Sequence, residues 1–281
     1  MRITRIILVV VSILSVGLFA ISELNELIHR DASAPRIESE QDVAEIPCSY
    51  TREDLMQGIS AWDDEEGDLT SKVITGAFSR FIEKGVSSLT YVVFDSADRS
   101  ASLTRKVRFT DYHSPCFTLS EPLVFVEKNG TYDDVLSRLG ATDVLDGDRK
   151  DWIVCTESDV NYQLQGTYTI SFEVENSFGD SSSVDLPVHI VSSDDGQPDI
   201  RLTQGIVYIT QGEPLDPASY IASVTAEDGS VMDPSAVTVS SGVDVNTPGC
   251  YEVYYRTSGG ESPAGETWLT VIVEAKEGQD E

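Results

Sequence analysis

The stretch GTYTISFEVENSFGD, from Gly166 to Asp180, decides the fold of this 281-residue chain. Its apolar side chains fall on every second position, at Tyr168, Ile170, Phe172 and Val174. Successive side chains of a β-strand point to opposite faces, so this alternation predicts a strand with one face in a core. A second alternating run follows at Val184, Leu186, Val188 and Ile190. The region therefore predicts two long, half-buried strands.

The same pattern occurs in two further copies along the chain. Corresponding strands read Leu89, Tyr91 and Val93 in the first copy and Tyr251, Val253 and Tyr255 in the third. Four landmarks stay in phase through all copies: Pro35, Pro115 and Pro198; Gly67, Gly147 and Gly229; Gly85, Gly166 and Gly249; Val107, Val188 and Val271. Short strands separated by turns, without helices between them, favour an antiparallel β-sandwich of about six or seven strands per copy.

One residue breaks the repeated pattern. Arg105 occupies the position that Leu186 and Leu269 hold in the other copies. A charged side chain is rarely buried, and a long one can extend its charged end into water. We therefore expect Arg105 to lie near a frayed strand end or to reach outward.

Two of the copies share an acidic turn, which reads AWDDEEGDLT at 61–70 and ATDVLDGD at 141–148, and strand-rich segments occur at 91–107, 166–180 and 249–257. With these motifs the copies resemble the immunoglobulin-like repeats of exported bacterial surface proteins. The resemblance implies three tandem immunoglobulin-like modules at residues 35–111, 115–191 and 198–274, followed by an acidic tail at 275–281. Such modules serve as spacers, stalks or binding tips, so the resemblance says little about activity.

The N-terminus predicts a membrane segment. Arg2 and Arg5 precede a run without charged residues from Ile6 to Ile21, and apolar residues continue toward Arg30. We expect residues 1–30 to form a short cytoplasmic stub and an uncleaved transmembrane helix, although the run is shorter than the roughly 20 residues of an ordinary span.

The basic N-terminal end favours an orientation with that end in the cytoplasm and residues 31–281 outside the cell. The alternative is a cleaved signal peptide, because Ala20, Ile21 and Ser22 form a small-x-small triplet that a signal peptidase accepts.

Composition and motifs argue against nucleic-acid binding and catalysis. The chain has 19 Lys and Arg against 48 Asp and Glu, whereas phosphate binding needs clustered basic side chains. His113 and His189 lack metal-ligand spacing, and we expect both to be solvated surface side chains. No nucleophile elbow, phosphate loop or dinucleotide fingerprint is present. We expect no enzyme activity and no required cofactor, with a carboxylate pair acting on a wall polymer as the alternative.

Acidic residues crowd around Gly67 in the first copy. Asp63, Asp64, Glu66 and Asp68 are the candidate ligands of a weak calcium site, because Ca²⁺ takes six to eight oxygen ligands. The spacing is not that of an EF-hand, so a neighbouring loop with Asp95 or Asp98 would have to add oxygens. The alternative is a solvated turn with a positive φ at Gly67 and an Asp that accepts backbone N–H bonds.

Four cysteines occupy positions that do not match between the copies: Cys48, Cys116, Cys155 and Cys250. Because only the second copy holds two, Cys116 with Cys155 is the one available pair within a module. The alternative is free thiols that pack as small apolar groups.

Two further features have both a structural and a functional interpretation. The three tryptophans, Trp62, Trp152 and Trp268, do not fall on the alternating core positions and are candidates either for a sugar-binding surface or for packing at module junctions. The sequence Asn129, Gly130, Thr131 predicts a hairpin turn, although in a eukaryotic secretory protein it would be a glycosylation acceptor.

These observations favour a non-catalytic cell-surface protein, held in the membrane by its N-terminal helix, whose modules meet an extracellular protein or an envelope glycan. The alternative is a carbohydrate- or peptidoglycan-binding protein with the third module as its binding tip.

Overall fold

A computed structural model describes residues 11–22, 24, 33–192, 197–257 and 264–276. The chain divides into two compact units. The first contains nearly all of the N-terminal module, and the second contains the other two modules with the short segments Pro47–Ser49 and Glu83–Gly85.

The N-terminal segment is helical at residues 11–22 and 24. The rest of the expected anchor, at residues 1–10, 23 and 25–30, lies outside the described residues. In the described part of the chain, no helix combines the length and the hydrophobicity that crossing a membrane requires.

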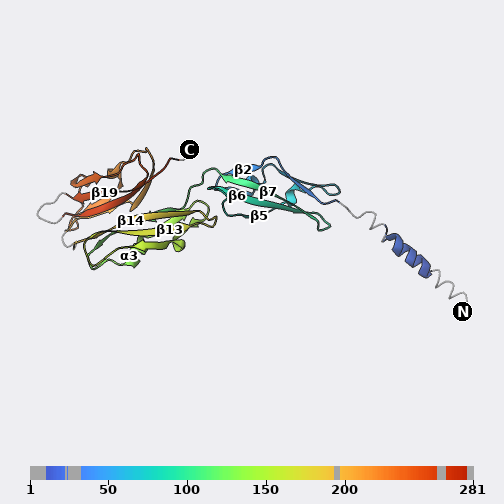
Figure 1. The fold of residues 1–281 in the computed structure, drawn as a ribbon, viewed down its shortest axis with the longest axis horizontal. Helices are drawn as coiled ribbons and strands as arrows, with labels where there is room; N and C mark the ends of the chain where they lie inside the picture. Colours follow the sequence, from blue (N-terminus) through green and yellow to red (C-terminus); the bar gives the residue numbers. More distant parts are fainter. Residues whose placement is uncertain (1–10, 23, 25–32, 193–196, 258–263, 277–281) are drawn as a thin grey trace. The chain divides into compact units, whose positions relative to one another are not determined.

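The N-terminal module, module 1, is a two-sheet sandwich (Figure 1). One sheet has the order β1-β3-β4 and the other β2-β7-β6-β5. The elements are β1 (Arg36–Ser39), β2 (Val43–Ile46), α2 (Arg52–Met56), β3 (Ile59–Asp63), β4 (Gly67–Asp68), η1 (Thr70–Lys72), β5 (Ile74–Phe78), β6 (Val86–Phe94) and β7 (Ser100–Phe109).

Module 2 repeats this plan with sheets β11-β10-β8 and β12-β13-β14-β9. Its elements are β8 (Cys116–Leu119), β9 (Val124–Val126), α3 (Tyr132–Arg138), β10 (Leu139–Asp143), β11 (Gly147–Asp148), η2 (Lys150–Trp152), β12 (Val154–Ser158), β13 (Gly166–Glu175) and β14 (Ser181–Val191).

Module 3 has sheets β15-β17 and β16-β20-β19-β18. Its elements are β15 (Asp199–Leu202), β16 (Ile206–Thr210), η3 (Pro217–Tyr220), β17 (Ile221–Thr225), η4 (Pro234–Ala236), β18 (Val237–Ser241), β19 (Gly249–Thr257) and β20 (Glu266–Glu274). The chain is thus a tandem array of immunoglobulin-like β-sandwich modules, as predicted.

The alternating residues form the cores as predicted. In module 2, Ile170 and Phe172 are fully buried, and in module 3 Val253 and Tyr255 are as well. Most strands pair antiparallel, but β14 pairs with β9 in parallel. This happens because β8 joins one sheet and β9 joins the other, so the chain changes sheets around Pro122.

Each module also carries a short helix that the strand pattern did not predict. The Asn129–Gly130–Thr131 segment is not a hairpin turn but leads into α3, whose N-cap is Thr131. Thr131 Oγ1 accepts from the N–H of Asp134, and the Asp134 carboxylate accepts from the N–H of Thr131. Thr51 and Asp54 form the same capping box at α2. In both capping boxes, side chains accept hydrogen bonds from backbone N–H groups at the helix N-terminus, which have no acceptor within the helix.

The expectation for Arg105 is wrong, because its side chain is buried, with only 4% of the residue exposed. Its guanidinium donates to the carbonyls of Leu55 at 2.6 Å and Gln57 at 2.8 Å, at the end of α2. It also donates to the Tyr91 hydroxyl at 3.1 Å and lies 5.1 Å from the centre of that ring. Arg105 is thus buried as the cap of the helix C-terminus, where cationic donors are favoured.

The expectation for His189 is also wrong, whereas His113 is exposed as predicted. His189 is 6% exposed because module 3 covers it. Its Nε2 lies 2.6 Å from Glu252 Oε1, and its ring stacks on Trp268 with centroids 3.9 Å apart. His189 would point outward on an isolated module 2, but in the second unit module 3 packs against it.

Modules 2 and 3 share a hydrophobic core at this contact. Ile206 belongs to the buried cluster of module 2, and Tyr208 and Ile272 pack against the same cluster. The Phe117 N–H donates to the Tyr208 hydroxyl at 2.9 Å, and burial raises the pKa of that phenol. We call this contact the seam.

The predicted Cys116–Cys155 disulfide is not formed, since all four cysteines are free thiols. Cys116 lies on β8 and Cys155 on β12, strands that belong to opposite sheets of the module. Burial raises the pKa of Cys116 to about 11, which favours an unreactive thiol.

Candidate functional site

The outer face of β1 and β3 in module 1 carries the most exposed aromatic site on a described strand. Alternation along β3 buries Ala61 and Asp63 and turns Ser60 and Trp62 outward. On the neighbouring strand Arg36 pairs with Trp62, and Glu38 pairs with Ser60. Four outward side chains therefore form one patch.

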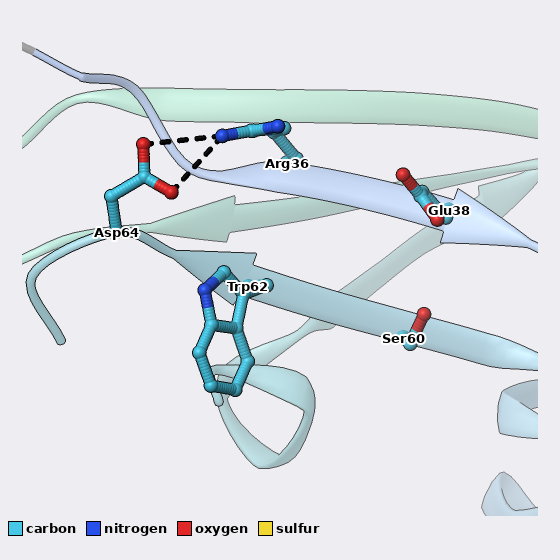
Figure 2. Close-up of a pocket in the computed structure, with 5 residues that line it drawn as sticks. All are labelled: Arg36, Glu38, Ser60, Trp62 and Asp64. Atoms are coloured by element: carbon cyan, nitrogen blue, oxygen red, sulfur yellow. Dashed lines mark hydrogen bonds and ion pairs between the residues drawn. The ribbon is translucent and has the colours of Figure 1, made fainter. Parts of the chain in front are cut away.

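Figure 2 shows this patch together with Asp64, which follows β3. These five residues line a shallow depression of about 330 Å³, which we call the Trp62 site. Arg36 Nη2 contacts both carboxylate oxygens of Asp64, at 3.0 and 3.1 Å. Trp62 is 56% exposed, and the edge of its indole lies beside Gly67, where a Cβ would stand 3.7 Å from it.

This arrangement combines two kinds of contact. The indole offers a flat apolar surface, while guanidinium, carboxylate and hydroxyl groups stand beside it. Such a site suits a ligand with one apolar face and a rim of hydroxyl groups, as in a sugar ring. The Arg36–Asp64 pair is itself exposed, so it contributes little to stability and is available to a ligand.

The three tryptophans have different environments. Trp152 is 62% exposed, and the Arg149 guanidinium lies 4.4 Å from its ring centre. Trp268 lies in the seam against His189, so the packing interpretation holds there. In module 2 the positions of Arg36 and Trp62 hold Cys116 and Thr142. The Trp62 site therefore has no aromatic counterpart on that face of module 2.

The acidic turn does not gather its carboxylates at one point. Asp64 pairs with Arg36, and Asp68 accepts from the Thr70 N–H at 2.8 Å, which lowers the Asp68 pKa. Glu66 accepts from Lys72 and from the Ser96 N–H, and these contacts lower its pKa to about 2. Only Asp63 is buried, and its Oδ1 accepts two backbone N–H bonds.

Gly67 has a φ of 78°. Together with the two N–H bonds to Asp63, this matches a turn with a positive φ at Gly67 and an Asp that accepts backbone N–H bonds. Among the described residues, no three His, Cys, Asp or Glu side chains form a group that could hold a metal ion. The loop that carries Asp95 does approach the turn, through Glu66 and Ser96.

The fold defines a class, the tandem immunoglobulin-like sandwich proteins, and the family match within module 3 agrees with it. Residues 208–273, in module 3, match the bacterial Ig-like domain (group 3). The chain is similar to the pesticidal crystal protein Cry22Aa of Bacillus thuringiensis, with 29% identity over 222 residues that cover 76% of this chain and 29% of that protein.

A second relative is an uncharacterized 81.3 kDa protein of Acholeplasma phage L2, 28% identical over 144 residues that cover 50% of this chain and 19% of that protein. This chain therefore spans less than a third of the length of either relative.

Solved structures that match this chain include a Clostridium perfringens ZmpB structure of the M60 catalytic domain with two CBM51 domains, at 14% identity and a TM-score of 0.25. It covers 87% of this chain and 31% of that one. The extracellular domain of protocadherin GammaB4 matches at 16% identity and a TM-score of 0.20, over 87% of this chain and 50% of that one. At these TM-scores the two structures say nothing about function, which is therefore argued from the residues of this chain.

Proposed function

We propose that this chain is a non-catalytic structural and interaction protein that presents immunoglobulin-like modules outside the cell. The observation that carries the proposal is the seam, where Ile206, Tyr208 and Ile272 join the core of module 2. A shared core between neighbouring modules restricts their relative motion, which suits a scaffold that holds a binding surface in place. Its test is whether modules 2 and 3 unfold together in one calorimetric transition.

The proposal includes a retained N-terminal anchor with the ectodomain outside. It is supported by the uncharged run from Ile6 to Ile21 behind two arginines. We expect the intact mass of protein extracted from membranes to correspond to the full chain. A species beginning at Glu23 would show that the segment is a cleaved signal peptide.

A second candidate function is carbohydrate binding, and the Trp62 site favours it. The carbohydrate-binding alternative drawn from the sequence places the binding tip in the third module, whereas the exposed indole beside an ion pair lies in module 1. The site is open and shallow, so one or two sugar rings of an envelope glycan are the ligand class it suits.

Replacing Trp62 with alanine is expected to abolish binding on a glycan array while changing the free energy of unfolding by no more than about 0.5 kcal/mol, since the side chain is exposed. Trp152→Ala is the matched control, because it removes an equally exposed indole from another module. Equal loss of binding in both variants, or no loss in either, would exclude the Trp62 site as the glycan contact.

A further inference from the structure

The acidic turns of modules 1 and 2 share one hydrogen-bond framework. In module 1, Asp63 Oδ1 accepts from the N–H groups of Glu65 at 2.9 Å and Glu66 at 3.0 Å. In module 2, Asp143 Oδ1 accepts from the two corresponding N–H groups, both at 2.9 Å. Asp63 and Asp143 therefore have the same position and the same orientation in their modules.

The loop that faces each turn is matched in the same way. Asp95 Oδ1 accepts from the N–H groups of Ala97 at 2.9 Å and Arg99 at 2.8 Å. Asn176 Oδ1 accepts from the N–H groups two and four residues later, both at 3.0 Å. The loops are also tied to the turns alike, since Glu66 accepts from the Ser96 N–H at 2.5 Å and Asp146 from the Ser177 N–H at 2.6 Å.

The residue that follows the long strand differs between the modules: it is Asp95 in module 1 and Asn176 in module 2. In module 2, Asn176 Nδ2 donates to Asp143 Oδ2 at 3.0 Å. The corresponding atom in module 1 is Asp95 Oδ2, which is an acceptor and receives Arg99 Nε at 2.8 Å. Asp63 Oδ2 has no hydrogen-bond partner, although Asp63 is only 1% exposed. Asp63 Oδ2 is thus a buried acceptor without a donor, whereas the equivalent Asp143 Oδ2 receives the Asn176 amide.

A buried carboxylate oxygen without a partner is costly, because it has lost its hydration without gaining another contact. A cation bound by Asp63 Oδ2 and Asp95 Oδ2 would give the Asp63 oxygen the favourable contact that the Asn176 amide gives Asp143 Oδ2 in module 2. We propose that module 1 binds a divalent cation of the calcium type between Asp63 and Asp95. The remaining ligands are water and backbone oxygens, as hard cations accept.

This site keeps one residue of the four predicted from the sequence. Asp64, Glu66 and Asp68 are held by Arg36, Lys72 and the Thr70 N–H. Because the protein supplies two carboxylates rather than three or more, we expect a dissociation constant in the range of about 10⁻⁴ to 10⁻³ M that is typical of extracellular modules. Mg²⁺ should bind more weakly, since it demands stricter octahedral geometry.

The test is a calorimetric Ca²⁺ titration of the full chain, combined with the melting temperature of module 1 in EDTA and in about 5 mM Ca²⁺. In the wild-type protein we expect that melting temperature to rise by roughly 3–6 °C with Ca²⁺. Asp63→Asn should weaken binding at least about tenfold, and it should raise the melting temperature in EDTA, because the new amide donates to Asp95 Oδ2 as Asn176 donates in module 2.

Asp64→Asn is the matched control, since it removes the same charge from the next residue, whose carboxylate is exposed. Its Ca²⁺ response should equal that of the wild type. The proposal is overturned if the wild-type protein does not respond to millimolar Ca²⁺, or if Asp64→Asn weakens binding as much as Asp63→Asn does, since binding would then be a diffuse effect of the acidic turn. It is also overturned if Asp63→Asn lowers the melting temperature in EDTA.

Discussion

Replacing Arg105 with alanine is expected to lower the free energy of unfolding of module 1 by about 3–5 kcal/mol, because breaking a buried network of a charged group is among the largest single-site effects. The Arg105 side chain fills a core position and donates to carbonyls at the end of α2. Alanine leaves a cavity there and leaves the Gln57 carbonyl without this donor.

Arg105→Leu distinguishes the two contributions. Leucine occupies this position in modules 2 and 3, as Leu186 and Leu269, and both are fully buried. The Leu55 carbonyl keeps one donor in this variant, the Tyr91 hydroxyl at 2.7 Å. We therefore expect Arg105→Leu to recover roughly half of the loss.

Urea denaturation of the three proteins, monitored for module 1, measures both effects. If Arg105→Ala unfolds within about 0.5 kcal/mol of the wild type, as an exposed position would, Arg105 does not hold α2. If alanine and leucine are equivalent, the hydrogen bonds rather than the packing account for the whole effect.

The sequence was sufficient to predict the strands and the repeat, because both follow from local alternation. Ile170 and Phe172 are buried as their spacing indicates. The helices α2 and α3 also had a local signal that strand periodicity obscured, since the capping boxes Thr51 to Asp54 and Thr131 to Asp134 are visible in the sequence. A threonine with an aspartate three positions later is the local sign of both helix starts.

The errors at Arg105 and His189 have a different cause. Arg105 was expected to be exposed because it is charged, and His189 because it falls on the outward-facing positions of its strand. Both are instead buried by partners that are distant in the sequence. The partners of Arg105 include backbone carbonyls 48 and 50 residues away, and Glu252 lies 63 residues from His189. Backbone acceptors have no residue-type signature, so no pattern around Arg105 indicates them.

The Trp62 site was predicted only in part for a similar reason. The outward phase of Trp62 is visible in the sequence, but its neighbours Arg36 and Glu38 become apparent only from the pairing of β1 with β3. The cation site depends on comparing two modules atom by atom. Asp95 and Asn176 occupy equivalent positions, but only Asn176 donates to the buried aspartate of its module, and Asp63 Oδ2 has no hydrogen-bond partner.

The seam predicts the second large effect. Gly205 lies where the backbones of modules 2 and 3 meet. Its N–H donates to the Leu119 carbonyl at 2.8 Å, and its carbonyl accepts from the Thr270 N–H at 3.1 Å. A Cβ on Gly205 would stand 2.8 Å from the Leu119 Cβ and even closer to the backbone carbonyl of Glu121. Glycine is required here by close approach, since backbone atoms cannot move aside as a flexible side chain can.

Gly205→Ala is therefore expected to open the seam and to lower the free energy of unfolding of the second unit by about 2–3 kcal/mol, in the range of overpacked sites. Differential scanning calorimetry should show modules 2 and 3 melting in one transition in the wild type and in two in the variant. Gly242→Ala is the control, because a Cβ there would meet only the Glu252 carbonyl, at 3.9 Å. If modules 2 and 3 already melt in two transitions in the wild type, the shared core does not couple them, and the scaffold role loses its main support. If Gly205→Ala melts as the wild type does, close approach at Gly205 does not hold the seam closed.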